Sequence, residues 1–303
     1  MKYDVLLIGG NGFVGSVIAR KLQQEGYSVL LPTRHLAAAR DLRLLPSMYL
    51  TDADVNDVQT LNRLCAQIKP SGTVINLVGV LHDRPAQPYG KVFKRAHVQL
   101  PQKVIAAMHA NGIKRYLHMS ALGADSQGPS MYQRSKGDGE AAVRASDLDW
   151  TIFSPSVFFG QEDQFINMFA SLAKVFPVIP LGNSQALFQP VSVNDVASAF
   201  VASIHMRQAI HQIYTLVGPD ILSMAELVRF AAEKAHTSTR VIPMPAIVGY
   251  LQALMFEFLP IPTLMSRDNI ASMQLPNVLP PAQADDLVST FGISRQSIRS
   301  LLV

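Results

Sequence analysis

The chain has one cysteine in 303 residues, and charged residues make up only 16% of it. A single cysteine allows neither an intramolecular disulfide nor a cysteine-based metal site, which is typical of a reducing compartment. Cys65 falls in the apolar helical pattern Leu61, Leu64, Cys65, Ile68, so we interpret it as a buried, unreactive thiol. The histidines show no metal-ligand spacing, and no metal site is predicted.

Long apolar runs and basic clusters are also absent. The apolar stretch Val5–Ile8 is too short for the hydrophobic region of a signal peptide, and no uncharged apolar run reaches the roughly 20 residues of a membrane-spanning helix. The formal net charge is +4, and the lysines and arginines are scattered without interleaved aromatic residues, unlike those of a nucleic-acid-binding protein. We therefore predict a cytoplasmic protein with no nucleic-acid partner and no transmembrane segment.

Hydrophobic residues make up 49% of the sequence, enough for a large core. In the first half, short β-rich runs alternate with helical patterns, which predicts an α/β fold with a doubly wound parallel Rossmann sheet. The expected strands are Tyr3–Ile8, Tyr27–Leu31, Met48–Leu50, Thr73–Val78, Arg115–Met119 and Trp150–Phe153. The expected helices between them are Phe13–Gln24, Val58–Ile68, Val92–Ala110 and Tyr132–Ala145.

The pattern changes after Pro155, and we predict two parts. Residues 1–155 are expected to form the dinucleotide-binding Rossmann core, and residues 156–303 a smaller α-rich lobe for a substrate or partner, with segments around 188–218 returning to the core. Asp195 either ties the lobe together near a helix start or is a simple helix cap, and we favour the cap. Helices are expected at Gln164–Val175, Asn194–His205, Ala246–Phe258 and Ser266–Met273.

The helix expected at Ala246–Phe258 is apolar on nearly every side. A buried core helix explains this composition. Two other interpretations stay open. The segment either lines an apolar cleft for a small molecule, or lies on a membrane surface and makes the protein peripheral to a membrane.

Gly9, Gly12 and Gly15 have the spacing G-x-x-G-x-x-G between the first expected strand and the first expected helix. This position requires glycine because the turn is tight, the backbone approaches a pyrophosphate closely, and the helix packs against the strand. The N-terminus of the helix then offers free N–H groups and a partial positive charge to the phosphates. We therefore predict a dinucleotide site formed by Gly9, Asn11, Gly12, Phe13, Val14 and Gly15.

The end of the second strand predicts which dinucleotide is bound. NAD sites usually place a carboxylate there for the ribose 2′-hydroxyl, but this chain reads Thr33-Arg34 and has no acid before Asp41. The Arg34 guanidinium would pair with a 2′-phosphate, so NADP (as NADPH) is favoured over NAD. Asp54 and Val55, after the third strand, are expected at the adenine amino group, although Asp54 fits a helix cap equally well.

Further motifs lie at the ends of the later strands and at the start of a helix, at Asn76–Gly79, His118–Ala124, Tyr132–Lys136, Ser154–Gly160 and Gln189–Val196. With the glycine turn, they resemble an extended or atypical short-chain dehydrogenase/reductase of the NAD-dependent epimerase/dehydratase type. The resemblance covers nearly the whole chain and is nearest to the branch that includes the NAD(P)H-binding accessory subunit of respiratory complex I. It implies further dinucleotide contacts from Leu77, Val78, Gly79, Lys136, Pro155, Ser156 and Val157.

Tyr132 and Lys136 are four residues apart, on one face of a helix. An ammonium beside a phenol stabilises the phenolate, so Lys136 is expected to lower the pKa of Tyr132. Tyr132 would then exchange a proton with a carbonyl oxygen while hydride moves to or from nicotinamide. Lys136 is also expected at the nicotinamide ribose, and Ser120 at the reacting oxygen. Many family members have a proton-relay asparagine where this chain has His97, a departure from the family pattern.

The leading functional prediction is an NADPH-dependent oxidoreductase that acts on a carbonyl or hydroxyl of an apolar substrate. The alternative is a non-catalytic NADPH-binding protein that docks to a respiratory complex or supports quinone metabolism, because the complex I relative holds its dinucleotide structurally. A sugar-nucleotide epimerase or dehydratase is a weaker third interpretation. The C-terminal lobe is apolar where a nucleotide-sugar site would need arginines and asparagines.

Overall fold

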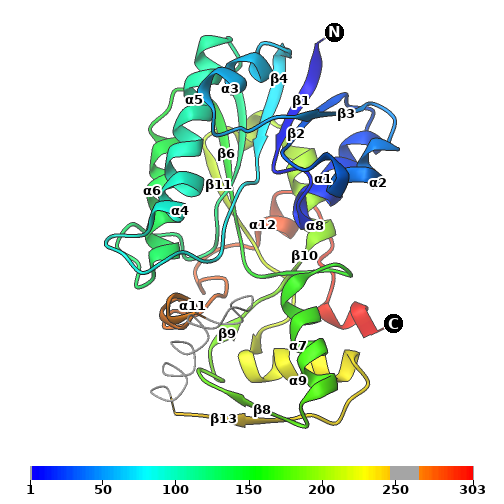
Figure 1. Ribbon diagram of the computed structural model, residues 1–303, viewed down its shortest axis with the longest axis vertical. Helices are drawn as coiled ribbons and strands as arrows, with labels where there is room; N and C mark the ends of the chain where they lie inside the picture. The colour runs from blue at the N-terminus through cyan, green and yellow to red at the C-terminus, as the bar shows by residue number, and fades with distance from the viewer. Residues whose placement is uncertain (1, 246–265, 303) are drawn as a thin grey trace.

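The computed structural model describes residues 2–245 and 266–302. The main strands are β1 (Tyr3–Ile8), β2 (Val29–Thr33), β3 (Met48–Asp52), β4 (Ile68–Asn76), β5 (Arg115–Met119), β6 (Asp149–Pro155) and β11 (Gln212–Leu216). They form a seven-stranded sheet in the order β11-β6-β5-β4-β1-β2-β3, and every neighbouring pair is parallel. The sheet and its helices form the upper part of the molecule in Figure 1, and a smaller lobe lies below the carboxyl ends of the strands.

The predicted α/β fold with a doubly wound parallel sheet is confirmed. The strand β11 was not among the predicted strands, although it extends the sheet beyond β6. In this edge strand Tyr214 and Leu216 are buried, whereas Gln212 and Ile213 are exposed. In this five-residue edge strand two exposed residues are followed by three buried ones, without alternation, so the sequence gives little periodic signal for a strand.

Helices cover both faces of the sheet (Figure 1). They are α1 (Phe13–Gln24), α2 (Arg40–Arg43), α3 (Val58–Cys65), α4 (Lys91–Phe93), α5 (Leu100–Ala110), α6 (Met131–Arg144) and α8 (Val193–Ser203). Leu7 of β1 packs in one core cluster with α1 and α8, while Leu6 and Ile8 pack on the other face with α3, α5 and α6. Because both faces are covered, the central strand β1 is apolar at almost every position.

The helix predicted at Val92–Ala110 is divided by a π-helical segment at Lys94–Gln99, between α4 and α5. This segment packs closely on α6 at Gly139. A Cβ added at Gly139 would overlap the carbonyl oxygen of His97, so only glycine fits there. Short π-helical segments in helices are frequent at functional sites. Here the widened turn sets the side chain of His97 beside the first turns of α6.

The lower lobe has a core cluster of its own. Its elements are β7 (Phe158–Phe159), α7 (Gln164–Val175), β8 (Val178–Leu181), β9 (Leu187–Phe188), β10 (Val191–Ser192), β12 (Leu222–Ser223), α9 (Met224–Lys234), β13 (Arg240–Pro243) and α11 (Arg267–Ser272). The last α-helix, α12 (Asp286–Ser289), lies beside the sheet instead. The helix α7 has the predicted bounds, and its first turn is capped by Asp163, which accepts a hydrogen bond from the Ile166 N–H. The helix predicted at Ala246–Phe258 lies outside the described residues.

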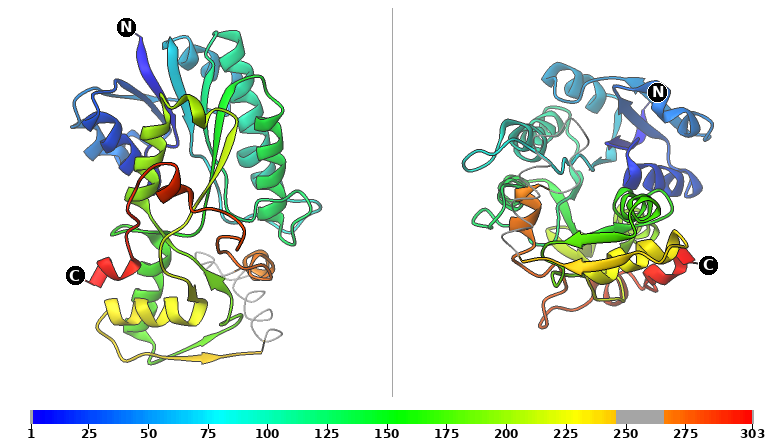
Figure 2. Two further views of the ribbon diagram at one scale, coloured as in Figure 1. Left: turned by 180° about the vertical axis from the view of Figure 1, so that it is seen from behind. Right: turned by 60° about the horizontal axis from the view of Figure 1, so that its bottom comes forward.

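The C-terminal segment runs from α11 in the lobe to α12 beside the sheet and then back to the lobe, as Figure 2 shows from behind. At the sheet it covers the edge strand β11. The Thr215 N–H donates to Asp286 Oδ2 at 2.7 Å, and Gln283 Nε2 donates to Thr215 Oγ1 at 2.8 Å. Leu287 of α12 is fully buried in the core cluster of α1 and α8. The last part of the described chain therefore completes the core of the sheet.

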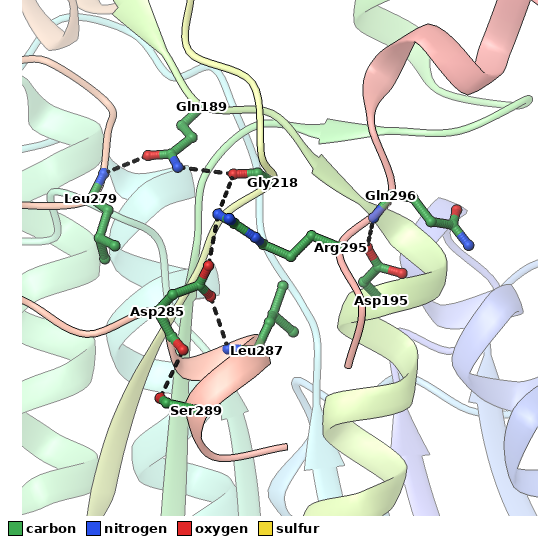
Figure 3. A network of polar contacts seen from close by, with 9 residues as sticks. All are labelled: Gln189, Asp195, Gly218, Leu279, Asp285, Leu287, Ser289, Arg295 and Gln296. Carbon is green, nitrogen blue, oxygen red and sulfur yellow. Dashed lines mark hydrogen bonds and ion pairs between the residues drawn. The ribbon is translucent and has the colours of Figure 1, made fainter. Parts of the chain in front are cut away.

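Polar contacts fix this returning segment around the Gly218 carbonyl, as Figure 3 shows. Arg295 donates to this carbonyl at 3.0 Å and pairs with Asp285, with Nη1 and Oδ2 2.7 Å apart. Gln189 donates to the same carbonyl at 2.8 Å and accepts from the Leu279 N–H at 2.9 Å. The Gly218 carbonyl thus accepts hydrogen bonds from Gln189, before β10, and from Arg295, after α12. Through Gln189 it is also connected to Leu279, before α12.

The interpretation of Asp195 as a simple helix cap is wrong. Ser192 caps α8, with its Oγ accepting from the Asn194 N–H at 3.2 Å. Asp195 lies in the first turn, is 3% exposed, and accepts from the Gln296 N–H at 2.8 Å (Figure 3). Its function in the fold is to hold the returning C-terminal segment against α8.

Cys65 is buried in the cluster of α3 and α5, and burial raises the pKa of its thiol to about 12. The structure thus confirms that the thiol is buried, and its raised pKa favours the uncharged, less reactive form. Within residues 2–245 and 266–302, no helix has the length and hydropathy needed to cross a membrane.

Candidate functional site

The glycine turn between β1 and α1 has the geometry of an anion-binding loop. Gly9 has φ +83°, a conformation that L side chains rarely adopt. A Cβ at Gly15 would overlap the Gly9 carbonyl oxygen and lie 2.6 Å from Gly10 Cα, so this position has no room for a side chain. Gly12 is the N-cap of α1, is exposed, and leaves the first N–H groups of the helix without a side-chain cap. This cradle of free N–H groups fits a pyrophosphate.

The residues flanking the turn complete one wall of the site. Asn11, Phe13 and Val14 are partly exposed around Gly12. The structure therefore places all six predicted residues of the turn on one short segment at the carboxyl end of β1.

The end of β4 lies directly beside the glycine turn. The Leu77 N–H donates to the Ile8 carbonyl at 2.9 Å, and a Cβ at Gly9 would lie 3.2 Å from the Val78 nitrogen. Gly79 is exposed, and a Cβ placed on it would lie 3.3 Å from Lys136 Nζ. The structure thus brings the predicted residues of β4 between the glycine turn and Lys136.

At the end of β2, Thr33 is buried and Arg34 follows it as an exposed residue. Asp54 lies close enough for the two charges to interact. Hydrogen bonds from Asn56, together with the charges of Arg34 and Arg95, hold the pKa of Asp54 below its usual value. Arg95 Nη2 lies 3.5 Å from Asp54 Oδ2. These residues border the region where the adenosine half of a dinucleotide was predicted.

Asp54 does not cap a helix. The cap of α3 is Asp57, which accepts from the Thr60 N–H at 2.8 Å. Asp54 instead accepts from the backbone and side-chain amides of Asn56, at 3.0 and 2.8 Å. The alternative of a capping residue is therefore wrong, and the partly exposed Val55 next to it packs on the core cluster of α3.

The helix α6 carries Tyr132 and Lys136, and its first turn is fixed by two sets of contacts. Ser130 and Gln133 form a reciprocal capping box. In addition, the carboxylate of Asp268 in α11 accepts from the Met131 N–H at 2.6 Å and from the Tyr132 N–H at 3.0 Å. A side chain of the lower lobe therefore satisfies the two free N–H groups next to the capping box.

Lys136 is buried, and its Nζ donates to the Met119 carbonyl at 3.2 Å. Burial lowers the pKa of Lys136 to about 8, an effect that the charge of Glu140 opposes. The expected lowering of the pKa of Tyr132 by Lys136 is not found. Burial raises the pKa of Tyr132 to about 12, because removing the phenolate from water outweighs any attraction to the ammonium.

His97, in the π-helical segment, is held as a neutral ring. Its Nε2 accepts from the Val80 N–H at 3.0 Å, so the proton lies on Nδ1, which is 2.8 Å from Ser135 Oγ. Burial and the nearby Lys136 lower the pKa of His97 to about 2. The ring lies edge-on to Tyr132 with centroids 5.6 Å apart. His97 is therefore uncharged at neutral pH, with a single ring proton on Nδ1, and positions its neighbours.

Ser120, at the end of β5, is buried and donates its hydroxyl proton to Glu140 Oε2 at 2.9 Å. Its role at a reacting oxygen stays a prediction. Glu140 was not among the predicted site residues, although its spacing of four residues from Lys136 repeats the spacing between Tyr132 and Lys136.

The predicted segment Pro155–Val157 lies at the end of β6, next to the end of β5. The Leu122 N–H donates to the Pro155 carbonyl at 2.8 Å. Ser156 Oγ donates to Asn277 Oδ1 at 2.6 Å, and Asn277 Nδ2 donates to the Leu122 carbonyl at 3.1 Å. Asn277 was not predicted, because no local pattern reveals contacts across 121 and 155 residues.

The fold and this site together define a dinucleotide-binding protein of the short-chain dehydrogenase/reductase type. Residues 5–216, from β1 through β11, match the NAD dependent epimerase/dehydratase family. The chain belongs to this family, which confirms the resemblance inferred from its motifs.

Individual relatives differ in what their names describe. NADH dehydrogenase (ubiquinone) 1 alpha subcomplex subunit 9 of Mus musculus mitochondria is 27% identical over 283 residues, which cover 90% of this chain and 72% of that protein. Ceramide reductase of Caulobacter vibrioides is 27% identical over 243 residues, which cover 80% of this chain and 73% of that protein. The solved structure of a Staphylococcus aureus nucleoside-diphosphate-sugar epimerase has a TM-score of 0.75 at 15% identity, covering 100% of this chain and 99% of that one. The structural similarity shows the shared fold.

Proposed function

We propose that the protein binds NADPH in preference to NADH and reduces a carbonyl group of an apolar substrate. The observation that carries this proposal is the placement of Lys136 Nζ against Gly79, with Tyr132 one helical turn away on α6. This arrangement joins an acid/base pair to the glycine turn through the end of β4. A bound NADPH supplies hydride at the nicotinamide ring.

Each part of the dinucleotide would be bound by different residues of this chain. The free N–H groups in the first turn of α1, which begins at Phe13, would hold the pyrophosphate. Arg34 would pair with the 2′-phosphate, since it follows β2 directly and is exposed. Lys136 would donate to the nicotinamide ribose. Asp54 and Val55 would lie at the adenine, and Pro155–Val157 would border the nicotinamide end.

The direction of the proposed reaction follows from the protonation of Tyr132. A phenol with a pKa of about 12 keeps its proton at neutral pH, so Tyr132 acts as a donor to a carbonyl oxygen. The ammonium of Lys136 then stabilises the phenolate that forms. The Ser120 hydroxyl donates its hydrogen bond to Glu140, so it can only accept hydrogen bonds from other groups. Tyr132 is therefore the proton donor at the carbonyl.

An apolar substrate is supported by the name of one relative, a ceramide reductase that is similar over 80% of this chain. The apolar composition of the segment 246–258 points the same way, although it lies outside the described residues. A cleft lined by such a segment would accept a long hydrocarbon chain.

A second function is favoured by a different observation. The similarity to the mitochondrial subunit covers 90% of this chain, and that protein is named as a subunit of a larger enzyme. In this case NADPH would stabilise the fold, and the protein would act by contact with a respiratory complex at or near a membrane. The raised pKa of Tyr132 is compatible with this function, because a phenol that keeps its proton needs no catalytic role.

A comparison of Tyr132→Phe with the wild type separates the two functions. NADPH oxidation is measured with long-chain ketones and short-tailed quinones, and NADPH affinity by calorimetry. For a reductase we expect the variant to lose about 100-fold in turnover with affinity nearly unchanged. Tyr214→Phe, on β11, is the matched control. Binding of NADPH without turnover of any compound by the wild type would favour the accessory function, and equal turnover by Tyr132→Phe would exclude Tyr132 as the donor.

A further inference from the structure

Glu140 lies next to two predicted residues of the site, Ser120 and Lys136. Its Oε2 accepts the hydroxyl of Ser120 at the end of β5, at 2.9 Å. It also follows Lys136 by four residues on α6, so the two side chains lie on the same face of the helix. Tyr132, Lys136 and Glu140 therefore form one stripe along α6, with Ser120 bonded to the far end.

The charged and titratable groups around Lys136 come from three elements. On α6, Glu140 favours the ammonium form, and Arg144 one turn further on acts on Glu140. His97 of the π-helical segment and His118 of β5 also interact with Lys136. Burial lowers the pKa values of these histidines to about 2 and about 3, so both are neutral above pH 5.

Glu140 is therefore the group whose charge supports the buried ammonium. Burial raises the pKa of Glu140, but the Ser120 hydroxyl and the charges of Arg144 and Lys136 favour its ionised form. In return, the carboxylate opposes the loss of the proton from Lys136. The neutral carbonyl of Met119, 3.2 Å from Nζ, supplies a hydrogen-bond acceptor without a formal charge.

We propose that Glu140 is a positioning residue, whose carboxylate keeps Lys136 in the ammonium form at the dinucleotide and directs the Ser120 hydroxyl away from the substrate. The proposal rests on the proposed position of Lys136 at the nicotinamide ribose and is independent of turnover. NADPH binding then depends on pH, because Lys136 loses its proton as the pH rises. Affinity is highest while the ammonium is present and falls as the pH rises past about 8.

Two substitutions separate the charge of Glu140 from its hydrogen bond. Glu140→Gln keeps the length of the side chain and an oxygen that can accept from Ser120, but removes the charge. Glu140→Asp keeps the charge and shortens the side chain, so the bond to Ser120 is lost. Lys136→Arg replaces the titrating ammonium by a guanidinium that stays charged across the accessible pH range.

The experiment measures NADPH affinity of the full chain by calorimetry between pH 6.5 and pH 9. We expect a nearly constant affinity for the wild type below about pH 8, and a progressive decrease as the pH rises past this value. In Glu140→Gln the decrease moves to lower pH, and binding at pH 8 is about threefold or more weaker than in the wild type. Glu140→Asp keeps the wild-type profile, Lys136→Arg loses the decrease, and the exposed Glu233→Gln on α9 is the control.

Identical pH profiles for the wild type, Glu140→Gln and Glu233→Gln would overturn the proposal. If Glu140→Gln does not fold, as judged by circular dichroism, the wild type and Lys136→Arg still decide: a flat wild-type profile, or a decrease retained in Lys136→Arg, overturns it. These outcomes are distinct from a failure of the proposed reductase function, because they need no turnover.

Discussion

Asp268, in the lower lobe, accepts a hydrogen bond from the backbone N–H of Tyr132 at 3.0 Å, across 136 positions of sequence. Its other oxygen accepts from the Met131 N–H. A carboxylate at a helix N-terminus complements the helix dipole and satisfies N–H groups that would otherwise lack a partner. The lobe thus helps to fix the first turn of the helix that carries the proposed proton donor.

Asp268→Ala should therefore lower the free energy of unfolding by about 1–2 kcal/mol, the usual effect of losing a capping carboxylate. Asp268→Asn should lose less, because the amide oxygen can still accept one of the two hydrogen bonds. Urea unfolding followed by circular dichroism measures both. Asp147→Ala is the control, since Asp147 is exposed and makes surface ion pairs with His109 and Lys114. A loss no larger for Asp268→Ala than for this control would contradict the expectation.

The glycine turn offers a contrast between folding and binding. Gly12→Ala should fold normally, because its Cβ would lie 3.4 Å from the Gly9 oxygen and its φ is −80°. It should weaken NADPH binding about tenfold or more, because the methyl group lies where the pyrophosphate approaches. Gly15→Ala should instead destabilise the fold, because its Cβ would overlap backbone atoms of Gly9 and Gly10. Thermal unfolding and calorimetry on both variants test this, and a stable, binding-competent Gly15→Ala protein would be the opposite result.

Arg34→Ala tests the choice of dinucleotide. A guanidinium–phosphate pair at an exposed site is worth about 1.5–3 kcal/mol, or roughly tenfold to more than a hundredfold in affinity. The variant should lose this factor for NADPH and little for NADH, and the preference should shrink as salt screens the pair. Calorimetric titration of both dinucleotides is the measurement, with Arg43→Ala, on the exposed face of α2, as control. Equal affinity of the wild type for NADH and NADPH would refute this assignment of Arg34.

Two buried histidines should make the fold sensitive to mild acid. Burial lowers the pKa of His97 to about 2 and that of His118 to about 3, whereas both return to about 6.5 in the unfolded chain. Below pH 6.5 the unfolded chain binds protons that the folded protein does not. The free energy of unfolding should thus fall by up to about 1.4 kcal/mol per pH unit for each histidine, until the pH reaches the folded pKa values.

Urea unfolding between pH 6.5 and pH 5 measures this slope before most carboxylates titrate. His97→Gln and His118→Gln should each remove about half of it, whereas His205→Gln, at an exposed position, serves as control. A slope unchanged in both buried variants would show that other groups cause the acid sensitivity.

Much of the fold could be predicted because its signals are local. The apolar run of β1 and the glycines after it define a buried strand and a turn within fifteen residues. The bounds of α1 and α7 agree with the periodicity of their apolar residues. The strand β11 could not be predicted, because its five residues show no alternation of exposed and buried positions. The π-helical segment could not be predicted, because it packs against Gly139, which lies 40 or more positions further along the chain.

In the candidate site, too, the local features could be predicted and the contacts between distant residues could not. The glycine turn and the pair Tyr132–Lys136 are spacings within one element, so the sequence contains them. The partners that adjust their chemistry come from elsewhere: Asp268 bonds to α6 across 137 positions, and Asn277 reaches Ser156 across 121. The pKa of Tyr132 also depended on burial, which the spacing to Lys136 could not reveal.

The cover on β11 has a consequence for the synthesis of the protein. Asp286 bonds to the edge strand at Thr215, and the two residues are 71 positions apart. Ribosomes add about 5–20 residues per second, so the segment that covers β11 is synthesised roughly 4–14 s after the strand itself. During this time the edge of β11 is exposed. An open sheet edge is a template for pairing with other chains. The interval is one in which a chaperone bound to the nascent chain would prevent aggregation, and slower translation of residues 216–286 would lengthen it.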